Sequence, residues 1–267
     1  MRTWESMSLW AATVGLVTSP QPPDGGQFYD DAGVVASYLS HRRSSTRSPN
    51  IAMEEPAFLS EMDDIENQRV LDLGCGDGVF ADSVIDRGGR SYVGVDGSAA
   101  MIDGARSRIE HPRVSFIHER IEDYQVESES FDLVAARMAL HYIDDLDAVL
   151  LKIRNVLRPG GRLIFTVVHP VVTSTWSPNE GLRTDYTVDR YFDRGARQRE
   201  WFGSMVTWHH RTIEDYVSGV KRCGFDFVSL SECEPDAKLF VDRPEELERR
   251  RRVPLMLLIS ARRPADE

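Results

Sequence analysis

The residues best suited to chemistry are three glycines that directly follow an apolar segment. Residues 70–73 are apolar apart from one aspartate, and Gly74, Gly76 and Gly78 stand at alternate positions after them. Glycine adopts positive φ readily and lets a ligand approach the backbone without meeting a Cβ. A helix should begin just afterwards, and its first backbone N–H groups have no partners inside the helix. They can therefore receive a polar or anionic group of a ligand.

A carboxylate ends the next apolar segment, about twenty residues further on, at Asp96. In an open sheet of alternating strands and helices, an acidic residue at this spacing accepts hydrogen bonds from ribose hydroxyls. A glycine-rich turn alone also closes ordinary strand-to-helix connections. Together, the turn and the acidic strand end predict a nucleoside cofactor.

The position of the glycines distinguishes between nucleoside cofactors. The dinucleotide fingerprint G-x-G-x-x-G requires a third glycine where Val79 stands. Segment 70–78 instead resembles the first motif, (V/L)-L-D-(L/I)-G-x-G-x-G, of the class I S-adenosylmethionine-dependent methyltransferases. The resemblance continues in the family's order with Asp96, with Phe-Asp-Leu-Val at 131–134 and with Leu-Arg-Pro-Gly-Gly-Arg-Leu-Ile-Phe at 157–165.

This resemblance, which is close over residues 68–168, implies a site for S-adenosylmethionine. It places the methionine part over the glycine turn and the ribose on Asp96. The adenine region should fall at 120–122, where Arg120 replaces the family's usual aspartate, so we expect contacts from the Arg120 side chain and the Ile121 N–H. The cofactor-binding residues expected on this basis are Tyr29, Arg42, Gly74, Cys75, Gly76, Asp96, Gly97, Ser98, Met101, Arg120, Ile121, Glu122 and Arg137.

The alternation of apolar segments and helical patterns predicts an α/β fold with a doubly wound, mostly parallel sheet. The expected strands are 69–73, 91–95, 114–118, 131–135, 162–168, 225–231 and 255–261. Seven strands match the Rossmann-like sheet of the family, and by resemblance the last one is its antiparallel edge strand. We expect a flexible arm (1–27), a helical cap (28–66), the cofactor-binding core (67–168), a lid (169–211) and the C-terminal part of the sheet (212–267).

The lid interval breaks this alternation and is expected to be a long loop rich in aromatic residues. Large rings with polar tips are typical of small-molecule pockets, and the interval starts at a strand's carboxyl end, where ligands bind in this architecture. The alternative is that the rings seal the sheet edge or a dimer contact. The residues expected to bind an apolar or aromatic acceptor are Tyr29, His169, Trp176, Tyr191, Trp201, Trp208 and His209.

Histidines are the candidates for a general base, because the unperturbed imidazole pKa lies near working pH. His169, directly after a strand end, is the first candidate, and His141 and His210 follow. A structural role is the alternative for each, and an amine acceptor needs no base.

The Thr212 and Asp215 pair predicts a capping box at a helix start.

Composition limits the partners. The net charge of −11 argues against a nucleic-acid substrate, and residues 1–18 contain no apolar block long enough to span a membrane. Three cysteines without a C-x-x-C pair favour a cytoplasmic setting, and no metal is expected. The arm could join subunits into a homo-oligomer. We therefore expect methylation of a small molecule, in specialised metabolism; the alternatives are an NAD(P)-dependent oxidoreductase and a non-catalytic S-adenosylmethionine-binding partner protein.

Overall fold

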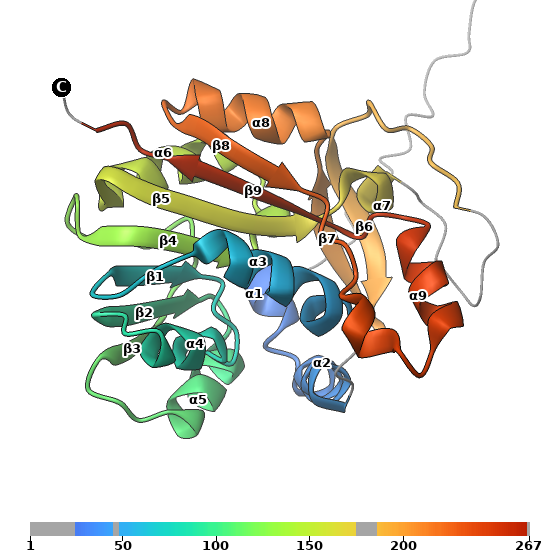
Figure 1. Ribbon diagram of the computed structural model, residues 1–267, viewed down its shortest axis with the longest axis horizontal. Helices are drawn as coiled ribbons and strands as arrows, with labels where there is room; N and C mark the ends of the chain where they lie inside the picture. Colours follow the sequence, from blue (N-terminus) through green and yellow to red (C-terminus); the bar gives the residue numbers. More distant parts are fainter. Residues whose placement is uncertain (1–24, 45–47, 175–185, 266–267) are drawn as a thin grey trace, which may run out of the picture.

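A seven-stranded sheet with strand order β3-β2-β1-β4-β5-β9-β8 forms the centre of the molecule (Figure 1). The computed structural model describes residues 25–44, 48–174 and 186–265. The strands are β1 (Arg69–Leu73), β2 (Ser91–Asp96), β3 (Val114–His118), β4 (Phe131–Arg137), β5 (Leu157–Val168), β8 (Asp226–Ser231) and β9 (Met256–Arg262). The first five pair in parallel, whereas β9 is antiparallel to both β5 and β8. The predicted Rossmann-like sheet and its antiparallel strand are confirmed; β8 lies outermost beside β9.

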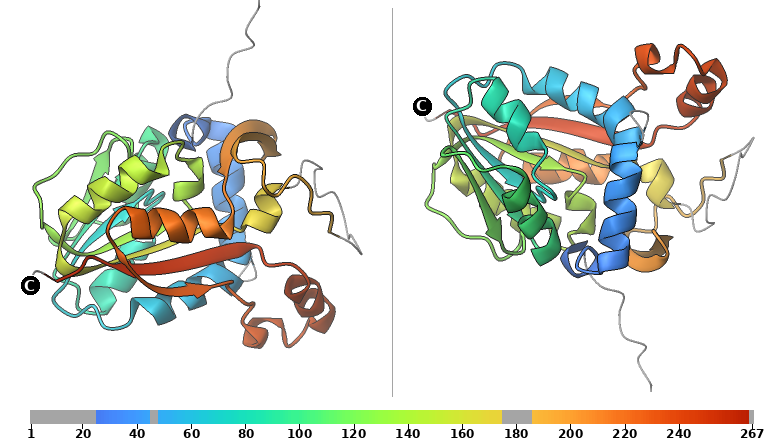
Figure 2. Two further views of the ribbon diagram at one scale, coloured as in Figure 1. Left: turned by 90° about the horizontal axis from the view of Figure 1, so that it is seen from above. Right: turned by 90° about the horizontal axis from the view of Figure 1, so that it is seen from below.

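Helices cover both faces of the sheet (Figure 2). One face packs against α3 (Glu55–Met62), α4 (Phe80–Asp86) and α5 (Ala99–Arg108), and the other packs against α6 (Leu146–Val156) and α8 (Ile213–Arg222). Side chains alternate across a strand, so Leu71 and Leu73 join one core cluster while Val70 joins the other. The predicted capping box of α8 is present: Asp215 N–H donates to Thr212 Oγ1 at 3.1 Å, and Thr212 N–H donates to Asp215 Oδ2 at 2.8 Å.

The strand order reverses between β1 and β4, which creates a crevice at the carboxyl ends of these strands. The N-terminal helices α1 (Gly25–Phe28) and α2 (Ala32–Ser44) lie at this end of the sheet (Figure 1), followed by the π-helix η1 (Asn50–Glu54) before α3. The segment expected to be a helical cap, 28–66, thus holds the end of α1 together with α2, η1 and α3. The expected boundary of the flexible arm, at residue 27, falls inside α1. The proposed subunit contact by the arm's aromatic residues lies outside the described residues.

The interval expected to be a long irregular loop contains regular structure instead. It holds α7 (Pro170–Ser174) and a two-stranded hairpin of β6 (Gly195–Trp201) and β7 (Ser204–His210). Phe202 and Gly203 connect the two strands with φ values of 49° and 80°. Two positive φ values are what a two-residue hairpin turn of type I′ requires. The sequence analysis missed this turn because an aromatic residue occupies its first position, where Asn, Asp or Gly is usual.

The remaining short elements lie between strands. The 3-10 helix η2 (Leu140–Tyr142) follows β4, and η3 (Ala237–Phe240) and α9 (Pro244–Arg251) form an excursion between β8 and β9 that projects from the body (Figure 2). The Asp145 carboxylate accepts from the Ala148 N–H and caps α6. Among the described residues, no helix has the length and apolar character needed to cross a membrane.

Candidate active site

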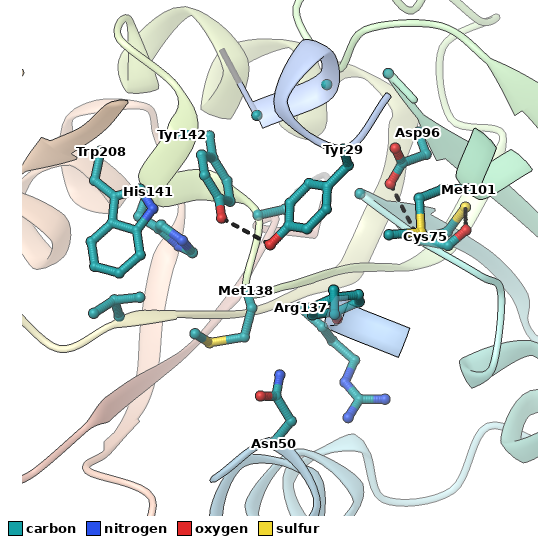
Figure 3. Close-up of a pocket in the computed structure, with 18 of the residues that line it drawn as sticks. Tyr29, Asn50, Cys75, Asp96, Met101, Arg137, Met138, His141, Tyr142 and Trp208 are labelled. Carbon is teal, nitrogen blue, oxygen red and sulfur yellow. Dashed lines mark hydrogen bonds between the residues drawn. The ribbon is translucent and has the colours of Figure 1, made fainter. Parts of the chain in front are cut away.

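A cavity of about 330 Å³ lies at the carboxyl ends of the parallel strands, and its size is within the range of small-molecule pockets, roughly 300–1,000 Å³. The turns after β1, β2 and β4 form its floor, while α1, α2 and η1 cover one side. The hairpin β6–β7, the end of β5 and α7 close the other side. Figure 3 shows side chains from these segments around the same space.

The three glycines after β1 all have positive φ, between 55° and 77°. A Cβ at Gly74 would lie 2.5 Å from the Cβ of Ala139, and one at Gly78 would lie 2.6 Å from the Phe116 ring. A Cβ at Gly76 would meet no heavy atom within 4 Å, although this residue lines the cavity. Gly74 and Gly78 thus permit close packing of the turn, whereas Gly76 keeps the cavity wall open to a ligand.

Asp96 is held at the cavity wall by two backbone donors. The Gly76 N–H donates to its Oδ2 and the Ser98 N–H donates to its Oδ1, each at 2.9 Å. Burial raises the pKa of the Asp96 carboxyl, and these two N–H groups oppose that shift. Each oxygen retains a free lone-pair direction, because a carboxylate can accept about four hydrogen bonds. The carboxylate is therefore oriented to accept two further hydroxyl donors.

The neighbours of Asp96 divide into lining and supporting residues. Gly97 and Met101, both predicted cofactor contacts, line the cavity. Ser98 does not: its hydroxyl accepts from the Met101 N–H at 3.2 Å and donates to the Tyr29 backbone oxygen at 2.8 Å. The prediction of Ser98 as a cofactor contact is corrected by this placement, because the side chain caps α5 and fastens it to the N-terminal segment.

Cys75 lines the cavity with a buried thiol, and burial raises its pKa well above the usual value. The thiol is therefore protonated at neutral pH and forms part of the wall, as predicted. Arg120, Ile121 and Glu122 line the cavity at the expected adenine region, where Arg120 Nη2 lies 2.9 Å from Glu122 Oε1. The structure thus brings the glycine turn, the acidic strand end and this third segment to one space.

Arg137, at the end of β4, forms an ion pair that the sequence analysis missed. Its Nε and Nη2 donate to the two carboxylate oxygens of Glu54 at 2.9 and 2.5 Å, and Thr166 donates to the same carboxylate at 3.0 Å. Glu54 is 1 % exposed. Burial opposes the charge on Arg137, but the Glu54 carboxylate outweighs it and raises the Arg137 pKa. The guanidinium lines the cavity with its charge already compensated.

Two tyrosines divide the cavity. The hydroxyls of Tyr29 and Tyr142 are 3.2 Å apart, and burial raises the Tyr142 pKa to about 12 and the Tyr29 pKa well above its usual value. Both phenols are therefore neutral at physiological pH. In Figure 3 the pair stands between Asp96 on one side and Trp208 on the other. Tyr29 was expected at the site; Tyr142 was not, although it directly follows the candidate base His141.

The side of the cavity beyond the tyrosine pair is lined by aromatic and aliphatic side chains, and we call it the aromatic end. The Trp201 ring centre lies 5.7 Å from that of Trp208 and 4.9 Å from that of Phe202. Val168 and Val172 add aliphatic surface from β5 and α7. The predicted Trp201 and Trp208 thus lie in the cavity wall, together with Phe202, Tyr38, Met138 and Arg199, which the prediction of acceptor contacts omitted.

Three of the predicted histidines lie outside the cavity lining, which corrects their assignment. His169 is buried, with Nε2 at 3.1 Å from Glu232 and with Nδ1 accepting from a backbone N–H. His210 is bonded to Thr173 Oγ1 at 2.6 Å and to a backbone oxygen at 2.8 Å. His209 lies 3.0 Å from the Asp144 carboxylate. Each ring is thus held by contacts within the protein, and none of the three lines the cavity.

His141 is the candidate base that lines the cavity. It is 2 % exposed, and burial lowers its pKa to about 3, so the imidazole is neutral. Its Nδ1 has no hydrogen-bond partner among the described residues, and its ring meets Trp208 edge-on at 5.5 Å.

The remaining predicted contacts do not reach the cavity or cannot be placed. Tyr191 lies outside the lining, where its hydroxyl accepts from the Ile213 N–H at 3.3 Å. Trp176 and the side chain of Arg42 lie outside the described part of the chain. Within that part, no three His, Cys, Asp or Glu side chains converge as a metal site would require.

Comparison with known proteins agrees with this geometry. Residues 70–161 match the family model of a methyltransferase domain. An S-adenosylmethionine-dependent methyltransferase structure from Mesorhizobium loti has 29 % identity and a TM-score of 0.72, covering 81 % of this chain and 98 % of that chain. A ubiquinone biosynthesis O-methyltransferase of Neisseria meningitidis is 30 % identical over 110 residues, which cover 40 % of this chain and 46 % of that protein.

A structure from Listeria monocytogenes, assigned to the same class of methyltransferase, gives the decisive comparison. It is 31 % identical, and the alignment covers 79 % of this chain and 97 % of that chain with a TM-score of 0.69. The open wall at Gly76 and the oriented carboxylate of Asp96 suit a nucleoside ligand with a chain beside its ribose. The chain therefore belongs to the S-adenosylmethionine-dependent methyltransferases, and S-adenosylmethionine is its cofactor.

Proposed function

We propose that the protein methylates an apolar or aromatic small molecule bound in the aromatic end of the cavity. The observation that carries this proposal is the lining of that end by Trp201, Phe202 and Trp208. Such rings bury large apolar areas and stack on flat ligands. The rest of the cavity matches the cofactor, so the aromatic end is the space available to an acceptor.

In this proposal the cofactor lies on the other side of the tyrosine pair. Asp96 accepts the ribose hydroxyls, the turn at 74–76 passes beside the methionine part, and residues 120–122 flank the adenine. The cofactor supplies a methyl carbon made electrophilic by its sulfonium. The protein then has to align the acceptor with that carbon and to exclude water. Tyr29 and Tyr142 lie where the two ligands would meet, and their neutral hydroxyls can hold an acceptor atom in line.

His141 is the described group best placed to receive a proton from an acceptor. A neutral imidazole with an unpartnered Nδ1 can accept a hydrogen bond from a hydroxyl or an amine. Burial lowers the His141 pKa to about 3, so the imidazole is a weak base. In this proposal its main role is to orient the acceptor by a hydrogen bond rather than to take up its proton. The relative from N. meningitidis is named an O-methyltransferase, which makes oxygen acceptors the first to test. Action in specialised metabolism stays a prediction.

The first experiment is calorimetric titration with S-adenosylhomocysteine, with NAD and NADP run in parallel. Asp96→Ala should weaken binding of S-adenosylhomocysteine by roughly tenfold or more, because hydrogen bonds to a charged group contribute about 1.5–3 kcal/mol. Asp86→Ala, which removes an exposed carboxylate at the end of α4, is the matched control and should bind as the wild type does. Equal binding by the Asp96 variant would remove the carboxylate from the cofactor site.

The acceptor is then sought by transfer of a labelled methyl group from S-adenosylmethionine to a panel of aromatic, aliphatic and strongly polar compounds. Turnover should be confined to compounds with a flat or apolar body. Trp208→Ala should raise KM for such an acceptor while leaving affinity for S-adenosylhomocysteine within about twofold, because the indole lies beyond the tyrosine pair. Turnover on polar compounds alone would contradict the proposal without affecting the family assignment.

A further inference from the structure

The hairpin places the positive charge of Arg199 at the aromatic end of the cavity. Side chains along a strand alternate between two faces. Arg199 stands opposite Val206 in the register and two residues before Trp201, and both Arg199 and Trp201 line the cavity. The Arg199 guanidinium carbon lies 5.1 Å from the centre of the Trp208 ring. The cation is therefore held against the wall of the acceptor space rather than directed to bulk solvent.

Arg199 differs from the other arginines that line the cavity because it has no carboxylate partner among the residues that the structure describes. Arg137 is paired with Glu54, and Arg120 with Glu122. In the described part of the chain, Arg199 forms no hydrogen bond or ion pair; its guanidinium stacks on the ring of Trp208 and lies near Tyr186. Arg199 is partly buried, and a partly desolvated charge with no carboxylate beside it is well placed to bind an anionic group of a ligand.

Arg197, on the same hairpin, differs from Arg199 because its guanidinium has hydrogen-bond acceptors within the protein. Arg197 occupies the same face two residues earlier, and its Nη2 donates to the backbone oxygens of Arg190 and Asp193 at 3.0 and 2.5 Å. Burial lowers the Arg199 pKa, and only the nearby Tyr186 opposes this shift. Arg197 thus fixes the end of the hairpin, while the donors of Arg199 remain available at the cavity.

A second donor lies beside Arg199. The indole Nε1 of Trp208 is buried and lies close to the Tyr142 hydroxyl, although the two form no hydrogen bond of normal geometry. Indole nitrogen and guanidinium are both donors and neither can accept. Two donors that adjoin one cavity favour a group with two acceptor oxygens and a negative charge, and a carboxylate paired with arginine meets this requirement.

We propose that the acceptor carries a carboxylate on its aromatic or apolar body, and that Arg199 binds this carboxylate with help from the indole N–H of Trp208. The inference rests on the proposed function and names the substrate class for it. The acid anchors one end of the acceptor at the hairpin. The body then extends along Trp201 and Phe202 toward the tyrosine pair, which presents the methylated atom to the cofactor.

The cofactor itself has a carboxylate, which is the competing partner for Arg199. The position of Trp208 argues against that pairing. Trp208 and Asp96 lie on opposite sides of Tyr29 and Tyr142 (Figure 3), and Arg199 stacks on Trp208. Arg199 is therefore a feature of the acceptor end, and the two assignments make different predictions for binding of S-adenosylhomocysteine.

The test uses the full chain saturated with S-adenosylhomocysteine and matched pairs of probes titrated by calorimetry. The pairs are benzoate with benzyl alcohol, 2-naphthoate with 2-naphthalenemethanol, and 2-anthracenecarboxylate with 2-anthracenemethanol. At least one carboxylate should bind roughly tenfold or more tightly than its alcohol, the preference expected for a charge-assisted hydrogen bond. Arg199→Met keeps the length and apolar surface of the side chain and should reduce that preference to about twofold or less.

Arg90→Met is the matched control, since it removes one exposed positive charge at the amino end of β2, away from the cavity. It should keep the full preference, and Trp208→Phe should lose part of it. The inference is overturned if no carboxylate is preferred by the wild type, or if Arg199→Met keeps the preference. It is also overturned if Arg199→Met weakens S-adenosylhomocysteine binding as Asp96→Ala does. None of these results would contradict the proposed methylation of an apolar acceptor, which is tested separately by transfer of a labelled methyl group to the panel of compounds.

Discussion

Replacing Gly76 by alanine separates the two roles of the glycine turn. Gly76 has a φ of 55°, and a Cβ there meets no protein atom within 4 Å. The added methyl group therefore causes backbone strain but no clash with the protein. It would instead stand in the space that the cofactor needs. We expect Gly76→Ala to fold with a small loss of stability and to lose most of its affinity for S-adenosylhomocysteine.

The expected loss of stability follows from the backbone conformation of Gly76, and the expected loss of affinity follows from the methyl group placed in the cofactor site. A left-handed conformation costs an L-residue about 1–2 kcal/mol, which lowers Tm by roughly 2–8 °C in a domain of this size. A methyl group forced into a well-packed site costs about 1–3 kcal/mol, which corresponds to roughly 5- to 150-fold in affinity. Gly74→Ala should be far less stable, because its Cβ would lie 2.5 Å from that of Ala139.

Gly160 supplies the control. It has a φ of 74°, its Cβ also meets nothing within 4 Å, and it lies outside the cavity lining. Gly160→Ala should therefore lower Tm as much as Gly76→Ala does and bind S-adenosylhomocysteine like the wild type. Thermal unfolding and calorimetric titration of both variants measure the two effects. The reasoning is refuted if the Gly76 variant retains wild-type affinity, or if both variants lose affinity equally.

Three further predictions concern stability. Glu54→Gln should destabilise the protein by about 1.5–3 kcal/mol in denaturant unfolding, because it removes the nearer of the two carboxylates paired with Arg137 and leaves only Glu55, at 3.4 Å; a loss below about 1 kcal/mol would show that the Glu54 pair contributes little. His141 has a folded pKa of about 3 and an ordinary value of 6.5, so the native state binds fewer protons between these limits and stability falls as pH drops below 6.5. At pH 4.5 this amounts to about 2–3 kcal/mol, and His141→Gln should flatten the pH profile by that amount; an unchanged profile would contradict the burial argument. Thr212→Ala should cost about 1 kcal/mol through loss of the capping box with Asp215, and Thr212→Ser should restore most of it.

Local patterns predicted the framework of the site well. The apolar segments located all seven strands of the sheet, and the turn at 74–78 and Asp96 do meet at one cavity. These features depend on short stretches of chain, since a buried strand, a positive φ and an acidic strand end are properties of a few adjacent residues. The capping box of α8 was predictable for the same reason.

The histidines show where sequence reasoning failed. Position after a strand end made His169 the first candidate base, yet its ring is bonded to Glu232 and to the backbone. Composition likewise identified an aromatic interval but not its hairpin, because Phe202 is an unusual residue at positive φ. Proximity in sequence to a strand end does not fix the direction of a side chain.

The sequence by itself determined the doubly wound sheet and the cofactor class, because each is encoded by local motifs. Only the tertiary structure decided which side chains share the cavity and which are already paired. Glu54 and Arg137 are separated by 83 residues, and Tyr29 and Tyr142 by 113. That Arg199 has no carboxylate partner among the described residues is likewise a property of the packed molecule. Contacts between distant segments depend on how whole elements pack, and no short stretch of sequence contains that information.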